Sequence, residues 1–218
     1  MVVQARAKAT RDAITQAAVA VFETTGYGDT GLVDILTRAN ITKGAFYYHF
    51  ATKESVASAI VEEAYARIHE LVVCTLQDPS SPALENLIRT TFVVADRIRG
   101  DQVVRVGHEL RQALPTVRGL ELAGFDTRRA AFVGAVEAAI AEGDVLADVD
   151  AGEVADAVRT MVVGTHALLG NTDDAVFRYL SATWRVILRG IVPADSLPYF
   201  QEFATRMGQR YVAATGVG

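Results

Sequence analysis

Apolar residues recur along this chain at intervals of three and four, the period of an α-helix that buries one face. The first clear stripe is Ile14, Ala17, Ala18, Val21 and Phe22. Similar stripes, bounded by glycine, proline or a capping side chain, predict helices in the ranges 52–76, 83–99, 101–114, 125–142, 150–170, 172–189 and 197–207. No alternation of period two competes with them, so the sequence predicts an all-α protein.

Between residues 31 and 53 the pattern changes to two short helices joined by a tight corner. Leu32, Ile35 and Leu36 form the stripe of the first helix, and residues 39–41 form the corner. Thr42 is placed to cap the second helix, because its hydroxyl can accept a hydrogen bond from an unpaired amide one turn later.

The second short helix has a small, basic start and two aromatic anchors. Phe46 and Phe50 are four residues apart and predict the buried side. Lys43 can reach a guanine edge, while glycine and alanine at the next two positions allow a backbone to approach a DNA groove. An ordinary helical hairpin with a solvated lysine remains the alternative. The outward side carries Tyr47, Tyr48 and His49, whose donors suit phosphate oxygens.

The run ITKGAFYYHFATKE, preceded by Gly26-Tyr27, resembles the helix-turn-helix of TetR-type bacterial repressors. The resemblance implies an N-terminal three-helix helix-turn-helix DNA-binding domain over residues 1–55 and a C-terminal helical ligand-binding and dimerisation domain over 56–218. The clearest break in the chain is at 77–82. The resemblance also implies a homodimer that binds a pseudo-palindromic operator in double-stranded DNA. The DNA-binding residues that we expect are Arg6, Arg11, Thr42, Lys43, Gly44, Ala45, Tyr47, Tyr48, His49 and Lys53.

One position departs from the family pattern, which commonly has threonine or serine where Gly31 stands. A capping box with Asp34 would then be incomplete, so Thr30 or Gly31 must cap the first short helix.

The net charge of −5 is unevenly distributed, which matters for a nucleic-acid partner. Residues 1–55 hold six basic and five acidic residues, whereas the remainder holds 15 basic and 21 acidic residues. Arg6, Lys8 and Arg11 precede every acidic residue, as expected of an arm that lies along phosphates or enters a minor groove. A solvated, frayed terminus is the alternative.

The second half has enough apolar residues to enclose a small hydrophobic effector with few polar contacts. A simple core is the alternative, and a mid-helix threonine can bond its own turn. Two helices, 150–170 and 172–189, carry more apolar surface than one partner covers, which favours a four-helix seam between two subunits. The ligand-binding residues that we expect are Phe92, Leu110, Arg128, Phe132, Met161, Val162, Thr165 and His166.

Within the TetR-like group the chain is similar to γ-butyrolactone autoregulator receptors, through the 42–50 run, Val163-Gly164-Thr165 and residues 189–193. The resemblance implies a repressor released by a γ-butyrolactone or another secondary metabolite. The family usually carries a tryptophan early in the helix at 125–142, at the position that Arg128 occupies in this chain. A further hypothesis is therefore that the protein recognises a more acidic signal, an antibiotic or the precursor of an antibiotic. Trp184 is then expected at the subunit seam. A regulator of an efflux or catabolic operon with an unrelated apolar ligand is the alternative.

Several classes of protein are not supported. The four histidines lack HExxH spacing, no carboxylates are paired for catalysis and no glycine-rich phosphate loop is present, so we expect no enzyme, catalytic residue, metal or cofactor. Cys74 is alone, which excludes an internal disulfide, and we expect it to be buried. No apolar run approaches the roughly 18 residues of a membrane span and no signal peptide is evident, so we expect no membrane partner and a cytoplasmic location. A helical interaction module and an activator remain open.

Overall fold

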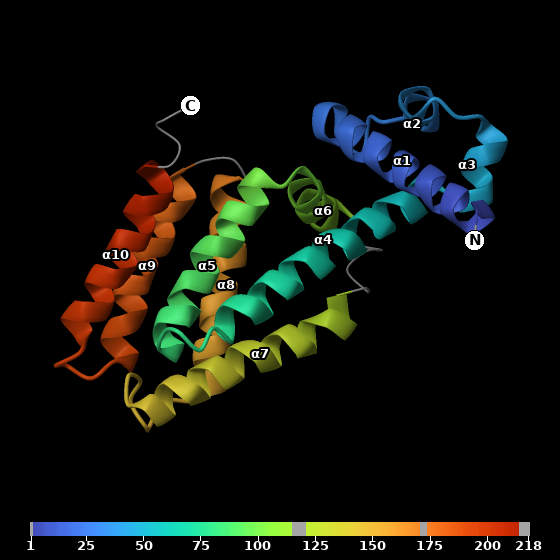
Figure 1. Cartoon of the computed structure of the whole chain (residues 1–218). Coiled ribbons are helices and arrows are strands. Elements are labelled where there is room, and N and C mark those ends of the chain that lie inside the picture. Colours follow the sequence, from blue (N-terminus) through green and yellow to red (C-terminus); the bar gives the residue numbers. More distant parts are fainter. Residues whose placement is uncertain (1, 115–120, 171–173, 214–218) are drawn as a thin grey trace. The chain divides into compact units, whose positions relative to one another are not determined.

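The computed structural model describes residues 2–114, 121–170 and 174–213, and within these ranges it consists of helices and contains no strand. The predicted all-α class is confirmed (Figure 1). The helices are α1 (Val2–Thr25), α2 (Leu32–Ala39), α3 (Lys43–His49), α4 (Lys53–Leu76), α5 (Ala83–Gly100), α6 (Gln102–Ala113), α7 (Glu121–Glu142), α8 (Ala151–Leu169), α9 (Ala175–Ile191) and α10 (Leu197–Ala213).

Two helices begin earlier than predicted. α1 starts at Val2, so the basic residues expected in an N-terminal arm lie on a helix, in keeping with the high helix propensity of the alanines at positions 5, 7 and 9. α7 starts at Glu121, because Gly124, interpreted as part of a loop, is tolerated inside the helix. Residues 115–120, interpreted from the sequence as a loop between two helices, and residues 172 and 173, at either of which the next helix is expected to begin, lie outside the described residues.

The chain divides into two compact units by its internal contacts. One unit comprises residues up to 67 together with 101–121, and the other comprises 68–100 together with the residues from 122 onward. The division falls inside α4 and assigns α6 to the first unit. This division by contacts does not test the boundary between the DNA-binding and ligand-binding domains, which stays a prediction at residue 55.

The first unit is held together by one hydrophobic core. Phe46 of α3, Phe50 at the C-cap of α3 and Ile35 of α2 are buried in it, as predicted. α4 contributes a long stripe, and α6 adds two residues that sequence spacing alone did not assign to this core. The buried members are Ile14, Ala18, Val19, Phe22, Ile35, Phe46, Phe50, Val56, Ala57, Ile60, Val61, Val106 and Leu110.

Polar contacts fix α6 to both α1 and α4. Arg67 of α4 donates to both carboxylate oxygens of Asp101, at 3.0 and 2.9 Å. The same carboxylate caps α6 by accepting from the amides of the helix's first turn. At the far end of α1, Glu23 pairs with Arg105 and accepts from Gln102. The hydrogen bonds from Arg105 and then Gln102 lower the pKa of Glu23, because they favour its charged form.

Gly107 allows α6 to lie directly on α4. A Cβ added there would be 2.4 Å from the Cβ of Ala64 and 3.3 Å from the carbonyl oxygen of Ile60. Because neither atom belongs to a flexible side-chain end, a larger residue must push the two helices apart.

Replacing Gly107 by alanine should therefore lower the free energy of unfolding by about 1–3 kcal/mol, since overpacking outweighs the gain in helix propensity. Urea unfolding followed by circular dichroism measures this change. Gly134→Ala is the matched control, because nothing lies within 4 Å of a Cβ at this helical position. The control should stabilise by up to about 1 kcal/mol. A Gly107→Ala protein as stable as the wild type would contradict the close packing.

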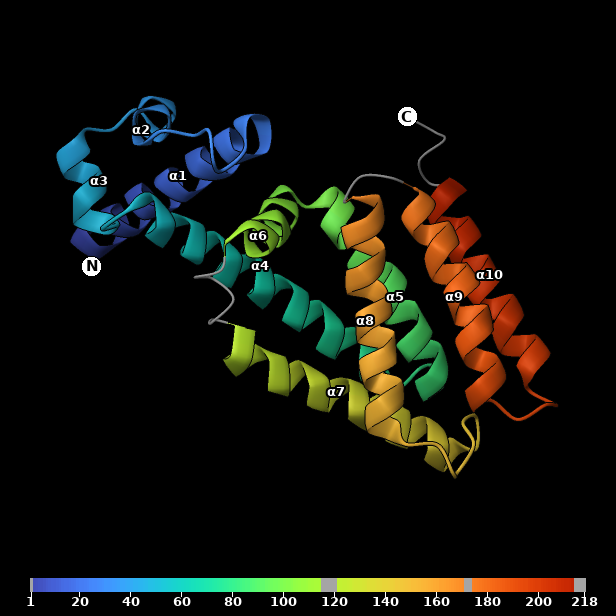
Figure 2. The ribbon, with the colours of Figure 1, turned by 180° about the vertical axis from the view of Figure 1, so that it is seen from behind.

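The second unit is built mainly from long helices that run side by side. α9 packs against α10, α8 and α5, and α10 also packs against α5 (Figure 2). Trp184 of α9 is fully buried and its indole Nε1 donates to Thr91 of α5 at 2.9 Å. The expectation that this tryptophan lies at a subunit seam is wrong, because its ring completes the core of its own chain.

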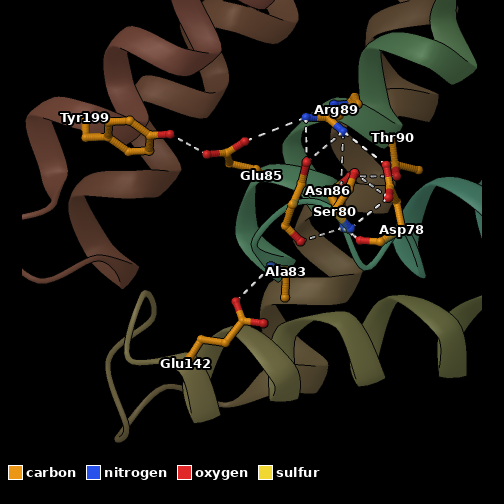
Figure 3. A network of polar contacts seen from close by, with 10 residues as sticks. Asp78, Ser80, Ala83, Glu85, Asn86, Arg89, Thr90, Glu142 and Tyr199 are labelled. Atoms are coloured by element: carbon orange, nitrogen blue, oxygen red, sulfur yellow. Dashed lines mark hydrogen bonds and ion pairs between the residues drawn. The ribbon is translucent and has the colours of Figure 1, made fainter.

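The predicted break at residues 77–82 is a loop that is tied to the first turns of α5. Asn86 donates through its side-chain amide to the carbonyl oxygens of Asp78 and Ser81, at 2.7 and 3.2 Å (Figure 3). Arg89 adds ion pairs with Asp78 at 3.7 Å and with Glu85 at 3.6 Å. The turn-forming residues therefore end α4 without leaving the loop unattached.

The start of α5 is also held from α7 and α10. The carboxylate of Glu142 accepts from the Ala83 amide at 2.8 Å, and the Tyr199 hydroxyl donates to Glu85 (Figure 3). The hydrogen bond to Glu85 and then burial raise the pKa of Tyr199. Cys74 of α4 is exposed, so the expectation that it is buried is wrong.

Candidate nucleic-acid interface

The turn between α2 and α3 has the geometry that the sequence predicts. Asn40 adopts a left-handed conformation with φ 51°, and its amide donates to the last turn of α2. Asparagine tolerates this conformation better than most residues. The Ile41 amide donates to the Leu36 carbonyl at 3.1 Å, so the two short helices meet at a defined corner.

The buried side of α3 fixes how this helix is held. Thr42 caps it as predicted, with its hydroxyl oxygen accepting from the Ala45 amide at 3.2 Å. Phe46 is fully buried, Phe50 is nearly so, and their ring centroids are 6.0 Å apart. One ring within this seven-residue helix and one at its C-cap therefore anchor α3 in the core of the first unit.

The opposite side of α3 is open to solvent. Tyr48 is 78% exposed and Tyr47 is 50% exposed, which is unusual for large rings. Lys43 and Gly44 are exposed, whereas Ala45 and His49 are half-buried. The Lys43 Nζ lies 5.9 Å from the Tyr47 ring centroid, and the Tyr48 and His49 rings meet edge to face. The structure therefore brings the predicted reading residues together on one helical face.

The start of α2 resolves the question raised by Gly31. Gly31 is the N-cap, and its amide donates to the Asp34 carboxylate at 2.7 Å, which supplies one half of a capping box. Thr30 is almost fully buried and donates instead to the Gly26 carbonyl at 2.7 Å. Its hydroxyl closes the loop before α2 and does not cap the helix.

Two of the cations expected to contact DNA have partners inside the unit. Lys53 donates to the carbonyl oxygens of Tyr27 and Thr30, at 2.8 and 2.7 Å. Arg11 donates to the His49 carbonyl at 3.1 Å. Arg6, the remaining predicted residue on α1, is exposed.

The expected ligand residues are divided between the two units. Leu110 lies in the core of the first unit, so we leave it out of the proposed ligand site. Phe92 is fully buried and stacks against Tyr211 of α10, at 6.2 Å and 10°. Tyr211 also stacks on Phe177 at 5.2 Å and 14°. Sequence spacing missed this cover because it comes from a helix more than 100 residues away.

The candidates on α8 lie on its buried side. Met161, Thr165 and His166 are buried, and Val162 is half-buried. The Thr165 hydroxyl donates to the Met161 carbonyl at 2.7 Å, within its own turn. Its polar group is therefore satisfied without a ligand.

On α7, Arg128 precedes the buried Phe132 by one helical turn and is half-buried. The neighbouring Arg129 donates to both carboxylate oxygens of Asp156 on α8, which places α7 beside α8. The hydrogen bond from Arg129 lowers the pKa of Asp156. The Arg128 side chain thus lies one turn from Phe132, near one end of the apolar side of α7.

Among the described residues, no group of three or more histidine, cysteine, aspartate or glutamate side chains has the arrangement to hold a metal ion. Within the same part of the chain, no helix is long and apolar enough to cross a membrane.

Comparison with known proteins connects both parts of the chain to regulators. Residues 14–60 match the model of bacterial regulatory proteins of the tetR family, and residues 81–193 match a tetracyclin repressor-like C-terminal domain. The A-factor receptor protein of Streptomyces griseus is 35% identical over 124 residues, which are 57% of this chain and 41% of that protein. The match therefore spans about two fifths of this relative's length.

Several solved structures match over nearly the whole chain, including the following two. A crystal structure of a gamma-butyrolactone receptor, an ArpA-like protein, is 33% identical with a TM-score of 0.76, over 94% of this chain and 99% of that one. CprB from Streptomyces coelicolor, in complex with its operator sequence, is 32% identical with a TM-score of 0.70 and the same coverage.

Proposed function

Because the chain belongs to the TetR family of bacterial regulatory proteins, we propose that it is a homodimeric, ligand-released transcriptional repressor. TetR regulators bind operator DNA and form dimers, and the matched relatives are regulators and not enzymes. The observation that carries the proposal is α3, whose aromatic side is buried while Lys43, Tyr47 and Tyr48 are exposed.

In the proposed complex, α3 of each subunit enters a major groove of a pseudo-palindromic operator. Lys43 reads a base edge, and Gly44 and Ala45 permit the backbone to approach. The hydroxyls of Tyr47 and Tyr48 donate to phosphate oxygens, which fixes the register. Thr42, His49 and Arg6 complete the proposed contacts.

Replacing Lys43 by alanine should weaken operator binding by about 1–3 kcal/mol and relax the preference at one base pair in each half-site. Binding titrations against operator variants at a fixed salt concentration measure both effects. Tyr47→Phe is the matched control, because losing a phosphate contact should weaken binding evenly across sequences. Unchanged affinity in both variants would count against α3 as the reading helix.

The proposed subunit seam lies on the outer sides of α8 and α9. Leu168 is 82% exposed on α8, and Val186 and Tyr179 are 66% and 56% exposed on α9. α8 and α9 are neighbours, so two copies of this apolar surface would form a four-helix seam around a twofold axis.

The proposed effector is a small hydrophobic molecule, such as a γ-butyrolactone or another secondary metabolite, that binds in the second unit. The similarity to gamma-butyrolactone receptors supports this class of ligand. Arg128, half-buried one turn before Phe132, favours an effector that also carries a hydrogen-bond acceptor or an acidic group. Effector binding then favours the conformation that does not bind DNA. It can shift this equilibrium by no more than the difference between the effector's affinities for the two conformations.

The experiment that tests the proposal is selection of genomic fragments by the purified protein, followed by gel shifts at two salt concentrations. A repressor of this kind loses affinity steeply as salt rises, because it releases counterions from the phosphates. Culture extracts are then screened for compounds that release the fragment. Failure of the protein to select any fragment would contradict the proposal. The proposed location of such a repressor is the cytoplasm.

A further inference from the structure

The helix-turn-helix is held at its entry and at its exit by a cation from a neighbouring helix. The entry is the loop of residues 26–30 before α2, and the exit is the C-terminal end of α3. Lys53 of α4 contacts the entry and Arg11 of α1 contacts the exit. Each cation combines a backbone carbonyl acceptor with the face of an aromatic ring.

At the entry, the Lys53 ammonium is surrounded by acceptors. Its Nζ lies 2.8 Å from the Tyr27 carbonyl oxygen, 2.7 Å from that of Thr30 and 4.2 Å from the Tyr27 ring centroid. An ammonium has three N–H groups, so two are used by carbonyl oxygens that belong to no helix. Charge-assisted hydrogen bonds of this kind are stronger than neutral ones, and they fix the loop from which α2 begins.

At the exit, the Arg11 guanidinium lies 4.2 Å from the centroid of the Phe50 ring. The same group donates to the carbonyl oxygen of His49, the last residue of α3. Carbonyls in the last turn of a helix have no partner within the helix, so this bond supplies one. Arg11 thus fixes the end of α3 against α1.

We infer that Lys53 and Arg11 are positioning residues of the DNA interface, which set the orientation of α3 without binding phosphate. The inference rests on the proposed function, because it concerns the same interface. It differs from the assignment made from sequence, in which both cations contact the phosphate backbone. Two N–H groups of Lys53 and one of Arg11 are engaged by carbonyl oxygens inside the unit, so each cation is held against the helix-turn-helix.

The salt dependence of operator binding distinguishes the two roles in the full-length protein. Lys53→Met and Arg11→Met should each weaken binding to the selected fragment by about five- to thirtyfold. The slope of log affinity against log salt should stay at the wild-type value. Loss of one phosphate contact in each subunit of a dimer would instead reduce the slope by about 1.8. A reduced slope, or an unchanged affinity, overturns the inference.

Amide hydrogen exchange tests the same inference without DNA. Lys53→Met should accelerate exchange in the loop at 26–30 and the first turn of α2, and Arg11→Met should accelerate it at the end of α3. Lys43→Met is the matched control, because it makes the same chemical change at an exposed lysine of the same unit. Unaltered exchange in both Lys53→Met and Arg11→Met overturns the inference.

Thr30→Val is a second entry variant that leaves every charge in place. It removes the hydroxyl bond to Gly26, so it should accelerate the same loop amides and weaken operator binding with no change of slope. Unchanged operator affinity despite faster exchange would show that loop geometry does not control reading. If the wild type selects no DNA, the proposed function fails. The exchange experiment still decides whether Lys53 and Arg11 hold the loop at 26–30 and the end of α3 in place.

Discussion

Replacing Phe46 by alanine is expected to lower the free energy of unfolding by about 3–5 kcal/mol and to abolish operator binding. The ring is fully buried in the core of the first unit and contacts the rings of Phe50 and Tyr47. Its loss leaves a cavity behind a helix of seven residues, which has little stability of its own. Urea unfolding and a binding titration on the same preparation measure the two effects.

Tyr48→Ala is the control on the same helix. Its ring is 78% exposed, so the free energy of unfolding should change by no more than about 0.5 kcal/mol. Operator affinity should nevertheless fall, because Tyr48 lies on the proposed reading face. A Phe46→Ala protein that keeps wild-type operator affinity would contradict the role of this ring in presenting α3.

Replacing Val186 by glutamate is expected to convert the proposed dimer to a monomer at micromolar concentration. In a single chain this side chain is 66% exposed, so the stability of one subunit should hardly change. In a twofold seam the same substitution buries two unpaired carboxylates, and each costs several kcal/mol. Sedimentation equilibrium measures the mass, and operator affinity should fall because the two half-sites are no longer bound together.

A control for this substitution is Ala138→Glu, at an exposed position of α7 outside the proposed seam. It adds the same charge and should leave both the mass and the operator affinity unchanged. A Val186→Glu protein that sediments as a dimer would place the seam elsewhere on the chain.

Local features of this fold could be predicted because their causes are local. The helices follow from apolar spacing. Thr42 caps α3 as predicted, and Asp150 caps α8 in the same way, since in each case the capping oxygen and its amide are three residues apart. Gly26 and Gly170 end helices with positive φ, which glycine adopts without strain. The solvent-exposed face of α3 could be predicted for the same reason.

Features that depend on distant partners could not be predicted. Lys53 and its acceptor Tyr27 are 26 residues apart, and Trp184 and Thr91 are 93 residues apart. Periodicity identifies which side of a helix is buried but does not identify the element that covers it. For this reason apolar spacing does not place α6 in the first unit, and it does not distinguish a Trp184 buried in its own chain from one at a subunit seam.

Hydroxyl-radical footprinting of the wild-type protein on its selected fragment tests the central claim most directly, that a dimer presents α3 to two major grooves. Two protected windows related by a pseudo-twofold axis are expected, with centres about 34 Å or a multiple of that distance apart. A single window, or protection without such symmetry, would contradict it.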